Sequence, residues 1–365
     1  MAMKQRMRDR LIASRLGNQR LTRTTLRRPG DVVQWLGAVQ AQDFATAKWG
    51  LALRARSLTE AAVDRAFNDG AILRTHALRP TWHFVTPADI RWILALTAPR
   101  VHAANAPYYK RNRLDRATLA KCRKVFERAL RDAAQRTRSE LAAALGARGI
   151  RASGERLAYI MLHAELEQVI CSGPRRGKQF TYALFDERVP AAQTMPRDEA
   201  LAMLTKRYFT SHGPATVRDF AWWSGLTARD ARTGIEMVTP ALAQASWDGL
   251  TYWFAAAPSS APPAAPTAHL LPNYDEYLIA YQDRGLVSRA AAAVTAKLRF
   301  DAYGNFLIVD GRFAGTWRRT VQRDAVHVKI VPLGPMTRAN RGALASAVAA
   351  FGRFLERPAT LTLAG

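Results

Sequence analysis

Three times along the chain, predicted helices are followed by two short strands that are joined by a loop or turn. The strand pairs fall at 72–85, 169–184 and 242–254. In the third pair the turn is Asp248-Gly249, which supplies the positive φ angles of a type I′ hairpin. Helices followed by a β-hairpin form a winged helix, so this order of elements predicts three such units. The copies share no sequence identity, so the repeat is one of architecture.

An α+β fold follows from this order, with three tandem winged-helix units and a small β-rich unit at the C-terminus. The predicted units are a first winged helix over 1–86, a basic helical connector over 87–136, a second winged helix over 137–190, a third over 191–255 and the β-rich unit over 256–365. The last unit begins with an Ala-, Pro- and Ser-rich linker at 255–268. Short strands around a turn at 303–305 predict a small sheet or partial barrel, closed by a helix over 340–355 and a strand over 359–363.

The charge balance indicates a polyanionic partner. The chain of 365 residues has 54 Lys and Arg against 29 Asp and Glu, a formal net charge of +25. Between residues 110 and 138 there are eleven basic and three acidic side chains, too many to pair internally. Nucleic acid is the leading candidate. A bias towards GC-rich codons, which also enriches arginine, is the alternative explanation.

Cysteine usage and hydropathy indicate the compartment. Cys122 and Cys171 are far apart and lack a C-x-x-C partner, so the sequence supports neither a disulfide framework nor a zinc ribbon. The basic stretch 1–10 is not followed by an apolar segment of signal length, and no run approaches the ~18 apolar residues of a membrane span. We therefore expect a cytoplasmic, nucleoid-associated protein without membrane contact.

Two glutamines follow the first strong helix pattern. A helix that begins near Pro29-Gly30-Asp31 carries Val32, Val33 and Leu36 on one face. Gln40 and Gln42 come where this periodicity stops, so an extended backbone there would point both amides to one side. A Q-x-Q sequence alone is weak evidence, and a solvated helix end is the simpler interpretation.

The familiar catalytic motifs do not occur in the sequence. There is no phosphate-binding glycine loop, no H-E-x-x-H and no acidic cluster for two metals, so we expect no metal and no cofactor. The seven histidines are scattered singly, and His163 is expected to be an ordinary surface or core residue. His76 and His83 are exceptions because they flank the loop of the first hairpin, near enough to the glutamines to share a site.

The glutamines belong to a longer run that resembles a known family. The run comprises 36–42, Trp49-Gly50-Leu51, Arg74-Thr75-His76 and 81–85. Together with the Leu-Leu-Pro-Asn-Tyr-Asp-Glu-Tyr segment at 270–277, it resembles the AlkZ/YcaQ family of winged-helix DNA glycosylases over nearly the full length. Gln40-Ala41-Gln42 is similar to the Gln-apolar-Gln motif of the AlkZ-like branch, although Asp43 directly after it could place a carboxylate nearby.

The resemblance implies a function. It implies a monofunctional, monomeric glycosylase that hydrolyses the N-glycosidic bond of alkylated purines, N7-alkylguanine and N3-alkyladenine, with interstrand crosslinks as further candidates. Gln40 and Gln42 would orient water and support the sugar cation, which suffices because an alkylated purine is already a good leaving group. In this family the helical units surround double-stranded DNA with a concave basic surface, and hairpins enter a groove of the DNA. Predicted DNA contacts are Arg74, His76, Arg79, His83, Arg175, Arg176 and Lys178.

Two rival functions remain at the level of the sequence. A non-catalytic winged-helix transcriptional regulator would be a dimer that reads two half-sites, whereas three dissimilar units favour a monomer. A ligand-binding or structural protein whose basic charge is only compositional would lack salt-dependent DNA affinity.

Overall fold

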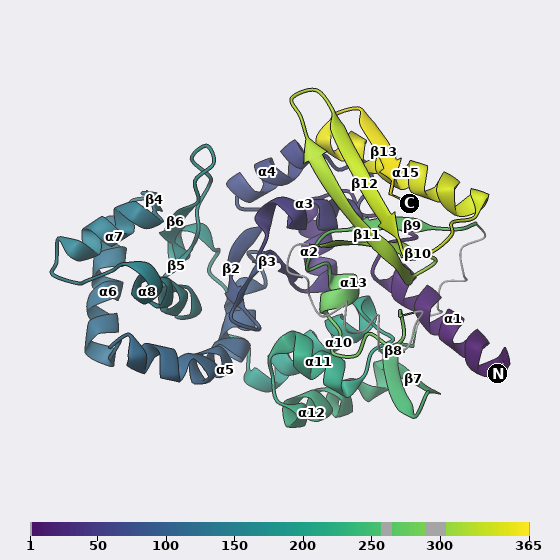
Figure 1. Ribbon diagram of the computed structural model, residues 1–365. Helices are drawn as coiled ribbons and strands as arrows, with labels where there is room; N and C mark the ends of the chain where they lie inside the picture. The colour runs from purple at the N-terminus through teal and green to yellow at the C-terminus, as the bar shows by residue number, and fades with distance from the viewer. Residues whose placement is uncertain (1, 257–264, 289–303, 365) are drawn as a thin grey trace.

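The computed structural model describes residues 2–256, 265–288 and 304–364 and shows a mixed α+β fold (Figure 1). The first group of elements is α1 (Ala2–Asn18), α2 (Pro29–Leu36), β1 (Val39–Gln40), α3 (Phe44–Ala52), α4 (Glu60–Asn68), β2 (Leu73–Ala77) and β3 (Thr81–Val85). The three strands form one sheet in the order β1-β3-β2. The helix expected from Pro29 ends at Leu36 because Gly37 takes a φ of 84°, and this turn leads directly into β1.

The second group forms a separate lobe, on the left of Figure 1. Its elements are α5 (Ile90–Arg111), α6 (Arg116–Ala129), β4 (Arg136–Thr137), α7 (Arg138–Gly146), α8 (Gly154–Leu166), β5 (Ile170–Ser172), β6 (Thr181–Leu184) and α9 (Phe185–Arg188). The strands pair in the order β4-β6-β5. Thr137 and Glu140 form a capping box that starts α7, since each side chain accepts the other's backbone N–H.

The third group ends in the predicted hairpin. Its elements are α10 (Arg197–Ser211), α11 (Val217–Ser224), α12 (Ala228–Val238), the 3-10 helix Thr239–Ala241, β7 (Leu242–Trp247) and β8 (Leu250–Ala255). Asp248 and Gly249 have φ angles of 53° and 76°, as a type I′ turn requires. The turn prediction at Asp248-Gly249 is therefore confirmed.

The C-terminal residues form a mixed sheet. Its elements are β9 (Ala268–Leu271), α13 (Glu276–Ile279), β10 (Asn305–Val309), β11 (Arg312–Val321), β12 (Val326–Pro332), α15 (Arg338–Leu355) and β13 (Ala359–Leu363). Among the described residues the sheet is open, in the order β13-β12-β11-β10-β9, so the small sheet and not the partial barrel is what forms. Residues 257–264 of the predicted linker and the predicted strand start at 299–303 lie outside the described residues.

One hydrophobic core joins the two ends of the chain. Trp49 of α3 packs against Phe351 and Phe354 of α15, with ring centroids 5.0 and 5.2 Å apart. Trp317 of β11 also packs on Phe351, with ring centroids 5.2 Å apart. The helices on either side of the glutamines, α2 and α3, therefore contribute to the same core as the C-terminal sheet, which lies beside them in Figure 1.

A glycine fixes the tip of the first hairpin against α11. Gly225 ends α11 with a φ of 70°, and a Cβ there would lie 2.2 Å from the carbonyl oxygen of Leu78. Leu78 is itself buried at the hairpin tip. The tip is thus already packed within the protein, and this hairpin cannot enter a DNA groove tip first unless the contact with Gly225 opens.

We expect Gly225→Ala to lower the free energy of unfolding by about 2–4 kcal/mol, because left-handed strain and a backbone clash add. Gly249→Ala is the matched control, since Gly249 has a similar φ but nothing within 4 Å of the added Cβ. It should cost about 1–2 kcal/mol. Urea unfolding of the two variants measures the difference, and equal losses would show that the contact with Leu78 contributes nothing.

Within the described ranges, no helix has the length and apolar character that crossing a membrane requires.

Candidate active site around Gln40 and Gln42

Gln40 lies in an extended strand, as the loss of helical periodicity predicts. It is paired with His83 in the antiparallel register of β1 and β3. The backbone N–H of Ala41 donates to the carbonyl oxygen of Trp82 over 2.7 Å, which continues the pairing one residue further. Directly opposed residues project to the same face of a sheet, so Gln40 and His83 are side-chain neighbours.

Gln40 is held at its backbone and at its side chain. Its backbone N–H donates to Oε1 of Glu276 over 2.8 Å, and its own Oε1 accepts from Nη2 of Arg79 at 3.3 Å. Only 6% of the residue is exposed. The guanidinium of Arg79 lies 5.4 Å above the ring of Trp222, so the cation that polarises the amide is itself fixed.

Gln42 is exposed, and its Oε1 accepts from the backbone N–H of Trp82 at 3.4 Å. The carboxylate of Asp43 accepts from the backbone N–H of Thr46 and so caps α3. The amide of Gln42 is thus hydrogen-bonded to the first hairpin, while the carboxylate of Asp43 serves as the N-cap of α3.

Glu276 is the centre of a buried polar network. Its Oε2 accepts from Nε1 of Trp223 at 2.9 Å and lies 3.3 Å from Nε2 of His212. Burial alone would raise the pKa of Glu276, but hydrogen bonds from His212 and from the Gln40 backbone outweigh it, so the pKa lies below its usual value. A buried carboxylate anion therefore supports the strand that carries Gln40.

An ion pair fixes the segment that carries Glu276. Arg54 donates to both carboxylate oxygens of Asp275 over 2.8 and 2.7 Å, and both side chains are 1% exposed. Arg54 also donates to Oε1 of Gln19 over 2.8 Å. Because Asp275 caps α13 through the backbone N–H of Tyr277, the same pair sets the start of the helix at Glu276.

His83 is completely buried next to this network. Its Nδ1 lies 2.9 Å from the carbonyl oxygen of Thr81, so Nδ1 carries the proton that it donates and Nε2 is an acceptor. No described residue donates to Nε2. Burial and the charge of Arg79 lower the pKa of His83 to about 3, so the ring is neutral.

This burial predicts a pH dependence of stability. Between pH 6.5 and about 3 the unfolded chain binds a proton at His83 that the folded chain does not, so stability falls as pH falls through this window. From pH 7 to pH 5 the His83 contribution is about 2 kcal/mol. We expect His83→Gln to show a correspondingly smaller loss in urea unfolding between these pH values. His327→Gln, at a half-exposed position, is the control, and an unchanged pH dependence in His83→Gln would refute the prediction.

Arg74 and His76 lie on the other face of the hairpin from His83, by the alternation of β2 and β3. Arg74 donates from Nε to the carbonyl oxygen of Ala41 at 2.9 Å, and burial lowers its pKa to about 10. His76 makes a 2.7 Å contact from Nδ1 to Oε2 of Glu165 on α8. The structure thus brings Arg74 to the glutamine backbone and ties His76 to the left lobe.

The second wing is largely occupied by contacts within the protein. Arg176 pairs with Glu140 at 2.8 Å, and the guanidinium of Arg175 lies 5.2 Å from the ring centroid of Phe44. Lys178 is exposed and has no side-chain partner among the described residues. DNA contact by these three residues stays a prediction, and Lys178 is the one whose charge is free to make it.

Sequence reasoning missed the residues beneath the glutamines. Glu276, Asp275, His212 and Arg54 are all buried and lie far from Gln40 in sequence. The signal available was Asp275-Glu276 within the aromatic and apolar segment 270–277, since adjacent carboxylates in such a segment need buried partners.

The larger cavities lie away from the glutamines. A cavity of about 840 Å³ is lined by α2, α4 and residues 190–192, and one of about 810 Å³ by α2 and α10. Neither is lined by Gln40 or Gln42. The exposed amide of Gln42 therefore meets solvent at the protein surface and not inside one of these cavities.

Comparisons with known proteins show what this chain is similar to. The family described as "DNA glycosylase AlkZ-like" matches residues 33–354. The "Interstrand DNA cross-link repair glycosylase" of Streptomyces sahachiroi is 28% identical over 342 residues, which cover 84% of this chain and 86% of that protein. The solved structure of Streptomyces sahachiroi DNA glycosylase AlkZ matches with a TM-score of 0.80 and 22% identity, covering 97% of this chain and 99% of the other. At that identity the structural likeness shows the fold.

Proposed function

The chain belongs to the AlkZ-like DNA glycosylase family and is a DNA glycosylase, and from this premise we propose that Gln40 and Gln42 are its catalytic pair. The observation that carries the proposal is that both amide oxygens of the motif are fixed by hydrogen bonds, to Arg79 and to the Trp82 backbone. The rival interpretation as a non-catalytic regulator is set aside by the family.

The two amides supply what hydrolysis of an activated glycosidic bond demands. Each amide oxygen has two lone pairs, and one is used by the protein, so the second can accept a hydrogen bond from the attacking water. The oxygens also place partial negative charge near the sugar, where positive charge develops in the transition state. A neutral amide is a poor general base, so the proposed substrates are purines whose alkylation already makes them good leaving groups, N7-alkylguanine and N3-alkyladenine.

The buried groups act through Gln40. Glu276 holds the strand and offsets the charge of Arg79, which would otherwise oppose a sugar cation nearby. His83 is fully buried, so we propose that it positions Gln40 from the paired strand and does not touch DNA. Arg74 has the same positioning role through the carbonyl oxygen of Ala41.

Bulky lesions fit a catalytic amide at the surface. The relative from Streptomyces sahachiroi is named for interstrand cross-link repair. In this chain Gln42 is exposed and the two cavities of about 800 Å³ lie elsewhere, so a crosslinked base would not have to enter a deep pocket. We therefore include interstrand crosslinks among the proposed substrates.

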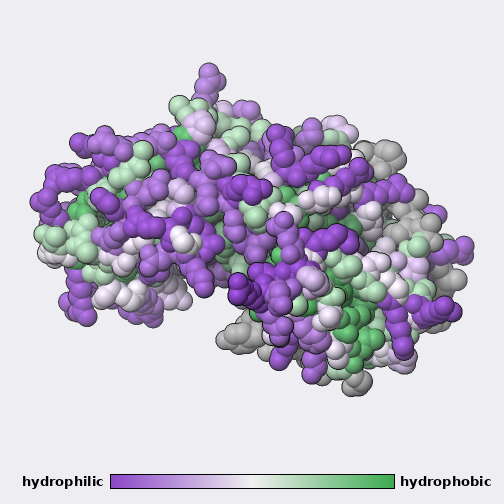
Figure 2. All heavy atoms as spheres, turned by 90° about the horizontal axis from the view of Figure 1, so that it is seen from above, coloured by the Kyte–Doolittle hydropathy of each residue, from purple (hydrophilic) through white to green (hydrophobic). Residues whose placement is uncertain are grey.

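DNA would be held mainly by exposed cations. Hydrophilic side chains cover most of the face in Figure 2, over both lobes. On and around α6 the exposed basic residues are Lys110, Arg111, Arg113, Arg116, Lys121, Arg123, Lys124, Arg128, Arg131 and Arg136. We propose a monomer with three winged-helix units, in which the chain is divided near residues 86, 136, 190 and 255. In this arrangement the basic residues contact the phosphates of DNA.

The test uses three duplexes that differ only in one position: unmodified guanine, N7-methylguanine, and a guanine crosslinked to the opposite strand. We expect release of the modified base, and strand separation of the crosslinked duplex after incubation, with no release from the unmodified duplex. Release of methylguanine without unhooking would limit the substrates to monoadducts. No release from either damaged duplex, despite salt-dependent binding, would contradict the proposed substrate class.

A further inference from the structure

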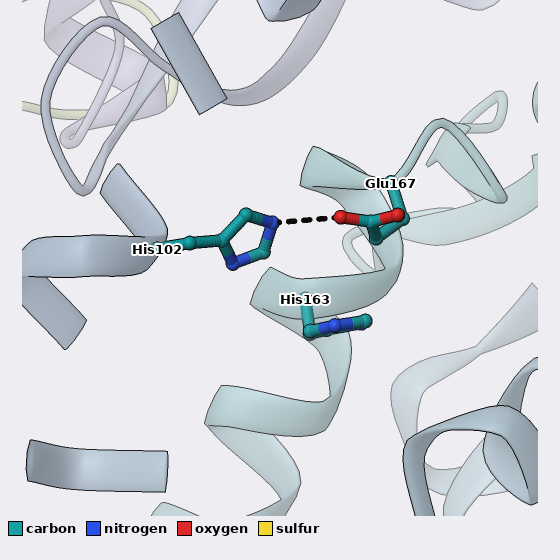
Figure 3. A group of neighbouring side chains, drawn as sticks. All are labelled: His102, His163 and Glu167. Carbon is teal, nitrogen blue, oxygen red and sulfur yellow. Dashed lines mark ion pairs between the residues drawn. The ribbon is translucent and has the colours of Figure 1, made fainter. Parts of the chain in front are cut away.

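We propose that His102, His163 and Glu167 form a Zn²⁺ site that joins α5 to α8. His102 comes from α5, while His163 and Glu167 come from the last turn of α8 and its C-cap (Figure 3). One ligand atom from each residue lies within 4.8 Å of the others. The sequence pattern treats His163 as an isolated residue because the linear spacing does not show that α5 brings His102 beside it.

The geometry suits a small divalent cation. His163 and Glu167 are four residues apart and therefore share one side of the helix. Nε2 of His102 lies 3.0 Å from Oε1 of Glu167, near the separation of about 3.3 Å between ligands of a tetrahedral zinc ion. The rings of His102 and His163 have centroids 5.0 Å apart, and both side chains are only half-buried, so His163 lies within reach of the same ion.

The contact between His102 and Glu167 already places a ring nitrogen beside a carboxylate. Nε2 of His102 is buried, and Oε1 of Glu167 lies 3.0 Å from it. Two imidazoles and one carboxylate are a known set of Zn²⁺ ligands, with water in the fourth position.

The residues around the cluster provide a hydrogen-bond partner for one ligand and a cavity that opens beside the site. Nδ1 of His102 is 2.9 Å from the hydroxyl of Tyr109, a bond that fixes the ring orientation as partners of metal-binding histidines do. A cavity of about 460 Å³ is lined by His163 and Glu167 and leaves room for a water as fourth ligand. Arg116 and Arg123 also line this cavity and will weaken the affinity, although Arg123 is paired with Glu127 at 2.7 Å.

A metal ion bound at this site would stabilise the position of the first hairpin. Glu165, two residues before Glu167, accepts from the backbone N–H of His76 at 2.8 Å. A metal that fixes the end of α8 against α5 would therefore stabilise the hydrogen bond between Glu165 and β2. This contact lies on the face of the hairpin opposite to His83. This is a structural role, independent of base release.

The experiment uses the full chain without a histidine tag, dialysed against chelator and titrated with ZnCl₂ in a calorimeter. We expect about one Zn²⁺ per chain, visible d–d absorption when Co²⁺ replaces it, and a rise in thermal midpoint with Zn²⁺. His102→Ala, His163→Ala and Glu167→Gln should each weaken binding at least about tenfold, and Tyr109→Phe by about tenfold. His327→Ala is the control for a histidine outside the cluster.

Two outcomes would overturn the site: no stoichiometric Zn²⁺ in the unmodified chain, or binding that survives His102→Ala and His163→Ala as well as it survives His327→Ala. Glu167 is half-exposed, so Glu167→Gln keeps the test valid even if an alanine variant unfolds.

Discussion

Gln40→Ala/Gln42→Ala should lose base release roughly 100- to 1,000-fold while it still binds DNA, because the amides act on the transition state and not on the phosphates. Gln42→Ala alone should account for much of this loss, since its exposed amide is the one that meets solvent. The measurement is single-turnover release of N7-methylguanine, paired with binding to the same duplex at two salt concentrations.

Gln322→Ala is the matched control, an exposed glutamine in the turn between β11 and β12. It should release base at the rate of the unmodified chain. Exposed substitutions of this kind change the free energy of unfolding by about 0.5 kcal/mol or less, so unfolding cannot explain a loss in Gln42→Ala. If the double variant keeps more than about a tenth of the activity, the glutamines are not the catalytic pair.

Arg54→Ala should lower the free energy of unfolding by about 3–5 kcal/mol, because it leaves the buried carboxylate of Asp275 without its partner. Arg28→Ala is the comparison, since Arg28 pairs with Asp31 at the solvent-exposed surface and its removal should have far less effect on stability. Urea unfolding of both variants measures the difference. Equal losses would mean that the buried pair is no more important than the exposed one.

A paired substitution separates the charge from the packing. Arg54→Met/Asp275→Asn removes both charges but keeps an acceptor for the backbone N–H of Tyr277, so it should recover at least half of the loss. The loss of Arg54 should also slow base release, because the segment that places Glu276 under Gln40 is no longer fixed. An Arg54→Ala variant with unchanged turnover would show that Glu276 does not depend on the ion pair.

Local chemistry explains which parts of the fold the sequence predicts. Asp248-Gly249 takes the turn that its φ angles demand, and the helix and strand predicted at 340–355 and 359–363 form at Arg338–Leu355 and Ala359–Leu363. Gln40 becomes extended where the apolar periodicity stops. In each case the residues involved are neighbours in the chain, so their preferences can be seen in a short stretch.

The features of the fold that were not predicted depend on residues that lie far apart in the chain. Arg15 of α1 is buried and donates to the carbonyl oxygen of Pro214, which lies 199 residues away in the chain. Strand β11 was not predicted. Its pairing with β10 on one edge and with β12 on the other holds Gly315 and the polar residues around it extended. Glu276 has no local pattern that assigns it to Gln40.

The core shared by the two ends of the chain has a consequence during synthesis. Glu276 leaves the ribosome 236 residues after the backbone N–H that it holds, a delay on the order of ten seconds or more. The delay between the synthesis of Trp49 and that of its partner Phe351 is longer still. An unfinished polypeptide therefore lacks the buried carboxylate that supports the strand of Gln40, and a truncated translation product cannot assemble the site proposed for base release.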